Sequence, residues 1–254
     1  MKKFRIPLLL TLLAASLTSA AADPVLIGRR GCAGGVENSV EAYREAVKRG
    51  YTMIEGHVRV TADSVFVTSH DGKTARLGGA LKVEESPYAA LKAERYTQTR
   101  EDSVTYTGSI CTVADFLCIC RDGGATAVLH LKAFPKGTHE GHLDALAALI
   151  SKVTSPDSVL VLTSSPEYID YLRARHPELP LMFQAEKTWP ERIEWCRERG
   201  LGIDLEKKLL TPECVKAYHD AGLKIAVWTV NDPEEARSLP VDYIITDTLL
   251  PGSF

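Results

Sequence analysis

Short apolar runs alternate with longer amphipathic stretches along almost the whole chain. The apolar runs have the length of buried strands, and the stretches between them repeat apolar residues at helical spacing. Several of these stretches open with a capping Ser, Thr or Asn, or carry Pro in the first turn. Strands are therefore predicted at residues 24–28, 52–58, 127–132, 158–163, 179–183, 201–205, 224–230 and 243–246. Helices are predicted at residues 39–49, 112–121, 142–152, 166–175, 189–198, 212–220 and 233–238.

Eight strands separated by helices favour a closed parallel barrel over an open doubly wound sheet. The predicted fold is a single α/β domain, a (β/α)8 TIM barrel. Residues 63–69 are expected to add a strand that pairs with the second one. The polar segment 73–108 interrupts the alternation and predicts a helical insertion after the second strand. No repeat or linker indicates a second domain, so one domain is expected over residues 23–254.

The composition is that of an ordinary globular domain, with 45% hydrophobic and 25% charged residues among 254. The net charge of −3, with no basic run beyond the N-terminus, argues against nucleic acid as a partner. Six cysteines permit disulfides or buried thiols, and their spacing does not decide between the two. The oligomeric state is left open.

Residues 1–22 have the three-part pattern of a secretory signal peptide. Lys2, Lys3 and Arg5 form a positive start, an apolar run follows, and small residues precede the expected cleavage site. The apolar run is shorter than the ~20 residues that span a bilayer, so no stable membrane anchor is expected. The mature chain, residues 23–254, is therefore predicted to be periplasmic or secreted.

Polar residues that could take part in catalysis or binding stand where the predicted strands end, which is where parallel barrels carry their active sites. Glu55 and His57 are two positions apart on one strand, so their side chains face the same way. His130 and Lys132 have the same relation on the next strand of the barrel. The strand-end set comprises Arg29, Arg30, Glu55, His57, His70, Asp71, His130, Lys132, Gln184, Trp228 and Asp247.

Two blocks of sequence resemble the glycerophosphodiester phosphodiesterase family, a barrel family related to the phosphatidylinositol phospholipases. The first block reads VLIGRRG, ENSVEAYREAVKRG and YTMIEGHVRVTADSVFVTSHDG, and the second reads AGLKIAVWTVNDPEEARSL and VDYIITDTL. The family has His-Arg-Gly, a helix that opens with Glu-Asn, Glu-x-Asp and His-Asp in the first block. The resemblance implies a phosphodiester hydrolase of lipid metabolism with a small-molecule phosphodiester substrate.

Transferred residue by residue, the resemblance implies catalytic roles for His70, Arg30 and Lys132. His70 would protonate the leaving alkoxide, because its unperturbed pKa near 6.5 suits proton transfer. Arg30 and Lys132 would hold the phosphate. Asn38, in the helix-opening pair, is expected to cap the first helix. Trp228 would stack on a glycerol or sugar face, although packing in the core is an alternative for its indole.

Three positions depart from the family pattern. Arg29 stands where the first catalytic His is expected, while His57 and His130 replace two carboxylates that bind a cation in the family. A guanidinium has no acceptor and is no base, so Arg29 is expected to bind substrate phosphate. Glu55 is the one retained member of the family's three-carboxylate site.

Two interpretations of the altered site remain open. Glu55, His57 and His130 form a set of two imidazoles and one carboxylate, which suits Zn²⁺, Mn²⁺ or Fe²⁺ better than Ca²⁺ or Mg²⁺. Alternatively, Arg29 supplies the positive charge and no metal binds. The preferred function is hydrolysis of glycerophosphodiesters or related small phosphodiesters at an altered site. The alternatives are an inactive barrel that binds a phosphorylated or sugar ligand, and cleavage by a hydroxyl of the substrate itself.

Overall fold

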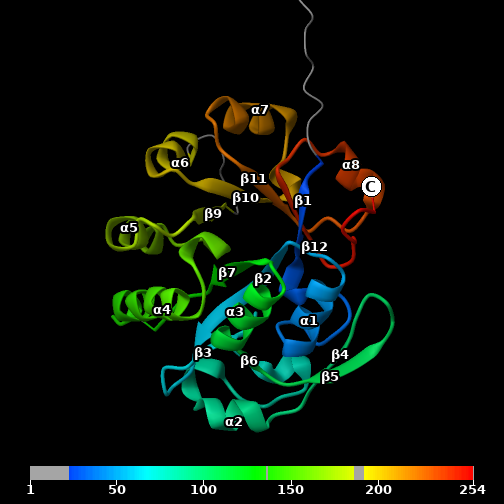
Figure 1. Ribbon diagram of the computed structural model, residues 1–254, viewed down its shortest axis with the longest axis vertical. Helices are drawn as coiled ribbons and strands as arrows, with labels where there is room; N and C mark the ends of the chain where they lie inside the picture. Colours follow the sequence, from blue (N-terminus) through cyan, green and yellow to red (C-terminus); the bar gives the residue numbers. More distant parts are fainter. Residues whose placement is uncertain (1–22, 136, 186–191, 254) are drawn as a thin grey trace, which may run out of the picture.

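The computed structural model describes residues 23–135, 137–185 and 192–253, and within these ranges eight parallel strands close into a barrel (Figure 1). The first strand pairs with both the second and the last, which completes the ring. The barrel strands are β1 (Val25–Gly28), β2 (Met53–Val60), β7 (Thr126–Leu131), β8 (Val159–Thr163), β9 (Leu181–Ala185), β10 (Gly202–Glu206), β11 (Ile225–Trp228) and β12 (Tyr243–Thr246). Each of the eight predicted strands is present, so the predicted barrel is confirmed.

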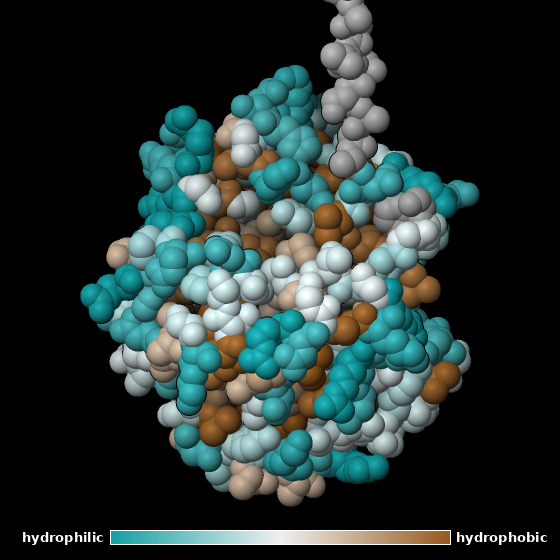
Figure 2. Space-filling view, in the orientation of Figure 1, coloured by the Kyte–Doolittle hydropathy of each residue, from teal (hydrophilic) through white to brown (hydrophobic). Residues whose placement is uncertain are grey.

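Helices cover the outside of the barrel, and α4 to α7 follow one another along one side of it (Figure 1). In Figure 2 the outer faces of these helices are largely hydrophilic, and apolar side chains show mainly between elements. The helices of the barrel are α1 (Val40–Lys48), α3 (Val113–Asp122), α4 (His139–Val153), α5 (Pro166–Arg175), α6 (Ile193–Arg199), α7 (Pro212–Asp220) and α8 (Pro233–Ser238). The predicted start of the helix at 189–198 lies outside the described residues.

Local chemistry explains where the helices begin. The side chains of Ser39, Thr112, Ser165, Thr211 and Asp232 accept a hydrogen bond from a backbone N–H in the first turn of their helices. Proline occupies the first turn of α5, α7 and α8, where the missing N–H has no cost. The expected cap at Asn38 is wrong by one residue, because Ser39 takes that position and Asn38 adopts a left-handed conformation with φ of 57°.

The insertion after β2 is partly helical, as expected, and also contains a hairpin. The predicted extra strand is confirmed as β3 (Phe66–Thr68), which pairs antiparallel with β2 and with β6 (Cys111–Thr112). The helical parts are two 3₁₀ turns, Thr74–Leu77 and Val83–Glu85, and helix α2 (Tyr88–Ala93). The hairpin joins β4 (Tyr96–Thr99) to β5 (Thr105–Gly108). Threonine and tyrosine favour strands, so the hairpin had a local signal.

The barrel interior is built in levels to which alternate strands contribute, because the strands are tilted. One apolar level follows from the strand register: Ile27, Val128, Met182 and Ala226. The next level towards the carboxyl ends is mixed: Glu55, Leu162, Asp204 and Ile245. Above it, strands β7, β9 and β11 contribute His130, Gln184 and Trp228. Polarity therefore rises steadily towards the mouth of the barrel.

The remaining expectations about the chain concern its cysteines and its N-terminus. All six cysteines are free thiols, and five of them are buried. None of the described helices is long and apolar enough to cross a bilayer. The predicted signal peptide, residues 1–22, lies outside the described residues.

Candidate active site

The strand-end residues predicted from the sequence meet in one small cavity at the mouth of the barrel. The cavity has a volume of about 120 Å³. It is lined by Arg29, Glu55, His57, His70, His130, Lys132, Gln184, Trp228 and Ile245. Three of the predicted residues, Arg30, Asp71 and Asp247, do not line this cavity but contact residues that do or follow them directly in the chain. The structure thus brings together side chains that lie on, or within two residues after, β1, β2, β3, β7, β9, β11 and β12.

A strained loop after β1 places the two arginines. Arg30 has φ of 53° and Cys32 has φ of 101°, both in the left-handed region that side chains rarely adopt. Arg29 turns towards the cavity, and its Nη1 donates to Asp247 Oδ2 at 3.1 Å and Oδ1 at 3.3 Å. Arg30 is buried, and its Nη1 donates to both Glu37 oxygens at 3.0 and 3.1 Å. Both guanidinium groups are therefore anchored by carboxylates.

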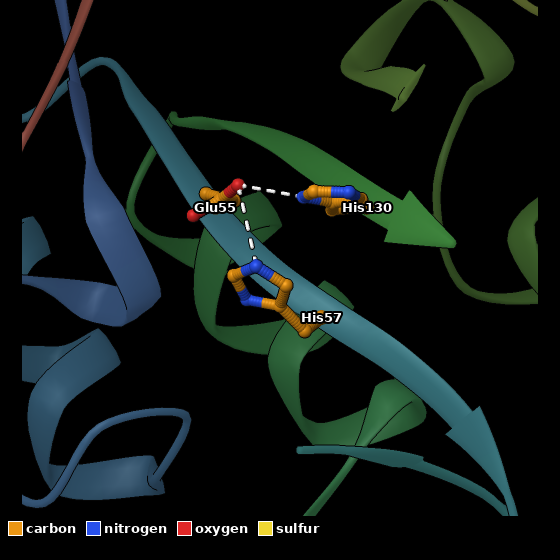
Figure 3. A group of neighbouring side chains, drawn as sticks. All are labelled: Glu55, His57 and His130. Atoms are coloured by element: carbon orange, nitrogen blue, oxygen red, sulfur yellow. Dashed lines mark hydrogen bonds and ion pairs between the residues drawn. The ribbon is translucent and has the colours of Figure 1, made fainter. Parts of the chain in front are cut away.

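Glu55, His57 and His130 form a compact buried group (Figure 3). His130 Nδ1 lies 3.0 Å from Glu55 Oε1, and His57 Nε2 lies 3.7 Å from the same oxygen. Gly56 allows this arrangement, because a Cβ there would lie 2.8 Å from a Phe116 ring atom and from the Tyr43 hydroxyl. Strand β2 can therefore pack tightly against α1 and α3 while both of its flanking site residues face inward.

The environment keeps the two imidazoles neutral. Burial lowers the pKa of His57 well below its usual value, and the nearby His130 and Lys132 lower it further. Burial also lowers the pKa of His130, although Glu55 opposes this effect. The pKa of Glu55 is lowered by the hydrogen bond from His130 and by nearby cations, despite complete burial. At neutral pH the group therefore consists of one carboxylate and two neutral imidazoles.

These residues fit a divalent cation. One ligand atom from each lies within 4.8 Å of the other two, and tetrahedral bonds of ~2.1 Å require separations of about 3.4 Å. Among the described residues, the buried Glu55 Oε2 and His57 Nδ1 have no hydrogen-bond partner. Neutral imidazoles and an ionised carboxylate are also the forms that bind metals. The group of Glu55, His57 and His130 is thus better explained as a ligand set than as core packing.

His70 approaches this group from the end of the β2–β3 hairpin. Its ring packs edge-on against His57, with centroids 4.7 Å apart. Its Nδ1 lies 2.7 Å from Asp71 Oδ1, and Asp71 is held in turn by Arg76 Nε at 2.6 Å. Burial and the charge of Arg30 lower the pKa of His70 to about 4. With Asp71 on Nδ1, the other ring nitrogen is left for proton exchange with a ligand.

Lys132 differs from Arg29, the other cation that lines the cavity, because no carboxylate among the described residues pairs with it. Its ammonium has no ion-pair partner within the part of the chain that the structure describes. Burial lowers its pKa to about 8, although Glu55 opposes this effect. A half-buried cation without a counter-ion is poised to bind an anion. This position agrees with the phosphate-binding role expected for Lys132.

Trp228 and Gln184 complete the wall opposite the histidines. The indole Nε1 of Trp228 is buried and has no partner among the described residues, so it offers a donor to a ligand. Gln184 Nε2 donates to Asp204 Oδ2 at 3.0 Å. Asp204 is fully buried, and burial raises its pKa well above the usual value. The sequence reasoning missed Asp204, whose only signal was an acidic residue inside an apolar strand.

Glu37 and Asn38 support the site, although the sequence predicted for them only a place at the start of the first helix. Asn38 Oδ1 accepts from the backbone N–H of His57 at 3.0 Å and from the Tyr43 hydroxyl at 3.2 Å. Glu37 binds Arg30, Arg76 and Gln98, which come from the β1–α1 loop, the insertion and the hairpin. The pair therefore fixes strand β2 and ties the insertion to the barrel.

Comparison with known proteins assigns the chain to a family. A model of the glycerophosphoryl diester phosphodiesterase family matches residues 24–250. The chain belongs to this family of phosphoric diester hydrolases. The resemblance inferred from the sequence is thus confirmed for nearly the whole barrel, and such enzymes typically use a divalent metal.

Individual relatives of this glycerophosphodiester phosphodiesterase family member are distant. The chain is 26% identical over 235 residues to a probable glycerophosphodiester phosphodiesterase 2 from Mycobacterium tuberculosis, covering 83% of this chain and 81% of the relative. A putative glycerophosphoryl diester phosphodiesterase from Silicibacter pomeroyi superimposes with a TM-score of 0.78 and 23% identity, covering 91% of each chain. An Oleispira antarctica phosphodiesterase, solved with its product sn-glycerol-3-phosphate, superimposes with a TM-score of 0.77 and 20% identity. The match covers 88% of this chain and 93% of that chain. The structural matches confirm the fold.

Proposed function

We propose that this protein is an exported hydrolase of glycerophosphodiesters or related small phosphodiesters, with an altered active site. The observation that carries this proposal is the place of Lys132. Its side chain lines the central cavity and two wider grooves, and it is the one residue that the described linings of the two grooves share. A phosphodiester has one anionic centre and two alcohol arms, so a central cation at the meeting point of two grooves matches its shape.

The two grooves are named here by their linings. The hydroxyl groove has a volume of about 390 Å³ and includes His139, Thr163, Ser164, Ser165, Glu167 and Tyr168. The basic groove has a volume of about 610 Å³ and includes Arg59, His70, Asp71, Lys73, Arg76 and Lys132. The phosphate would lie between them, against Lys132 and Arg29, and Arg30 would add its charge from behind.

The reaction that this arrangement supports is attack of water on phosphorus. The new P–O bond forms as the P–O bond to one alcohol breaks, which yields a phosphomonoester and an alcohol. His70 would give a proton to the departing alkoxide. The free site holds the pKa of His70 at about 4. The negative charge of a bound phosphodiester opposes that shift and favours the protonated ring.

Glu55, His57 and His130 would hold a divalent cation, and this mixed nitrogen and oxygen set supports Zn²⁺, Mn²⁺ or Fe²⁺ over Ca²⁺ or Mg²⁺. Such an ion supplies Lewis acidity that activates water and offsets charge on the phosphate. The metal-free alternative would use Arg29 instead. It is less well supported, because Nη1 of Arg29 is already engaged by Asp247.

The experiment combines activity with metal analysis on protein purified without chelator. We expect hydrolysis of glycerophosphocholine and close to one Zn²⁺, Mn²⁺ or Fe²⁺ per chain. His57→Ala or His130→Ala should remove the metal, because each leaves only two protein ligands. His219→Ala, an exposed histidine that pairs with Asp242 far from the cavity, is the matched control.

Each negative result has its own meaning. Folded protein without metal, even after exposure to all three ions, would support the metal-free use of Arg29. Folded, metal-loaded protein without activity on any diester would instead support the inactive binding barrel. That alternative rests on Arg29, which leaves His70 as the one acid–base group among the residues carried over from the family.

The proposal of export rests on the sequence of residues 1–22 alone. N-terminal sequencing of exported protein should return a start near Asp23. Recovery of Met1 from the exported protein would contradict cleavage.

A further inference from the structure

The two grooves that meet at Lys132 differ in charge, and this difference bears on the substrate. In the hydroxyl groove, His139 Nε2 lies 3.1 Å from Glu167. Apart from His130, Lys132 and Gln184, which also line the central cavity, the other polar side chains of this groove are hydroxyls. In the basic groove, Asp71 is the only acidic group among the described lining residues, and it faces Arg59, Lys73, Arg76 and Lys132. The first groove suits a neutral polyol such as glycerol. The second suits an anionic group.

Counter-ions behind the basic groove reduce this charge without removing it. Arg59 Nη1 pairs with Glu84, and Arg76 pairs with Asp71 and Glu37. Because Glu37 also pairs with Arg30, these three carboxylates balance Arg30, Arg59 and Arg76, and two positive charges are left over. Lys73 and Lys132 account for the excess, since neither ammonium has an ion-pair partner among the described residues. Lys73 is also exposed, so its charge is available to a ligand.

The position of His70 shows which groove receives the leaving alcohol. His70 lines the central cavity and the basic groove, whereas the lining of the hydroxyl groove does not include it. The group that protonates the alkoxide must lie within hydrogen-bond reach of the leaving oxygen. The leaving arm therefore starts beside His70 and extends over Lys73 and Arg76.

From this geometry, and resting on the proposed hydrolysis with His70 as the acid, we propose that the basic groove binds the leaving alcohol and selects one that carries a negative charge. A carboxylate or a second phosphate on that alcohol meets the excess charge of Lys73. A quaternary ammonium, as in choline, meets like charge and is disfavoured. The glycerol 3-phosphate portion occupies the cavity and the hydroxyl groove.

Three diesters of sn-glycerol 3-phosphate test the charge preference, with choline, ethylene glycol or glycolate as the second alcohol. Ethylene glycol and glycolate are nearly equal in size and differ by one negative charge. We expect kcat/KM to be highest for the glycolate ester and lowest for the choline ester. The products from the glycolate ester should be glycerol 3-phosphate and glycolate. Formation of glycerol and phosphoglycolate would overturn the assignment of the leaving arm.

A pair of charge reversals tests the groove itself. Lys73→Glu should lower the glycolate-to-ethylene-glycol ratio of kcat/KM by about threefold to tenfold, as expected for exposed charges at short range. Lys216→Glu is the matched control, because Lys216 is an exposed lysine on α7 that pairs with Asp220 and lies outside the linings of the cavity and both grooves. It should leave the ratio unchanged.

The outcomes separate the two proposals. The role of the basic groove would be overturned if the glycolate-to-ethylene-glycol ratio of kcat/KM were the same in the test and control variants, or if the wild type showed no charge preference. Either result would leave the proposed hydrolase intact. Failure of the wild type to cleave any of the three esters would overturn the proposed hydrolase. A circular dichroism melt of each variant confirms that its fold is retained.

Discussion

Two adjacent levels of the barrel interior differ in polarity and in whether their polar atoms are paired. The lower level, Ile27, Val128, Met182 and Ala226, is apolar and buried. One step nearer the mouth, the level of Glu55, Leu162, Asp204 and Ile245 contains two buried carboxyl groups, each with an oxygen that lacks a partner among the described residues. Unpaired buried polar atoms cost stability. The contrast shows where the fold gives up stability for chemistry.

The largest expected effect is at the mouth. His70→Ala should reduce kcat/KM for a glycerophosphodiester by about 10²- to 10⁴-fold, the range that a positioned acid–base group contributes. Stability should change little, because His70 is only half buried. Steady-state kinetics and a thermal melt together check this. Unchanged activity would remove His70 from the mechanism.

A substitution in the lower level should instead reduce the stability of the protein. Met182→Ala removes a buried side chain and should lower the free energy of unfolding by about 3 kcal/mol, within the range for such core truncations. Urea unfolding measures this loss. If Met182→Ala costs less than about 1 kcal/mol, the apolar level is not the stabilising part of the interior.

Glu37 should make stability depend on acid pH. Hydrogen bonds from Arg76 and Arg30 lower its pKa to about 2, against the cost of burial. Because the folded pKa is lowered, the contribution is complete above the unfolded pKa of ~4.5 and disappears as pH falls towards 2. For Arg30, by contrast, burial lowers the pKa by more than the charge of Glu37 raises it. The arginine nevertheless stays charged at these pH values.

Glu37→Gln should therefore cost about 3 kcal/mol at pH 7, and the difference from wild type should shrink between pH 4.5 and 2. Urea unfolding at several pH values measures it. Carboxyl groups that share no partner with Glu37 titrate equally in both proteins, so the difference reports Glu37 and the Asp71 carboxylate that shares Arg76 with it. A difference that does not vary with pH would refute the ion-pair explanation.

Restoring the family pattern at the mouth tests whether the departures limit turnover. The triple variant Arg29→His, His57→Asp and His130→Glu rebuilds an acid–base pair and three carboxylates on the same strands. With Ca²⁺ or Mg²⁺ it should hydrolyse glycerophosphocholine at least about tenfold faster than the wild type, at the low end of an acid–base contribution. A fast wild type and a slower variant would show that the altered site is tuned to its own chemistry.

The smallest expected effect concerns Asp204. Its pKa is raised by burial, so its unfavourable contribution appears as pH rises above the unfolded pKa. Asp204→Asn removes that cost and should stabilise the protein at pH 7 by about 1 kcal/mol, with no gain near pH 3. Unfolding at both pH values checks the sign. Destabilisation at pH 7 would show that the carboxyl group has a stabilising partner.

The sequence by itself determined the barrel and much of the candidate site. Strand-length apolar runs, helix caps and the His70–Asp71 pair are local patterns, because each depends on residues within a few positions of one another. The side-chain period of two placed Glu55 with His57, and His130 with Lys132, on shared faces. The resemblance to the family then supplied roles for these positions.

Closure of the barrel decided the remaining features. Arg29 meets Asp247 across 218 positions of sequence, and Asp204 meets Gln184 because β9 and β10 pair in one particular register. The cap moved from Asn38 to Ser39 because the Asn38 side chain binds β2 instead. These contacts join segments whose separation is set only by register and tilt, so no local pattern encodes them. The tertiary structure alone therefore decided which polar groups are paired at the mouth and which remain free for a ligand.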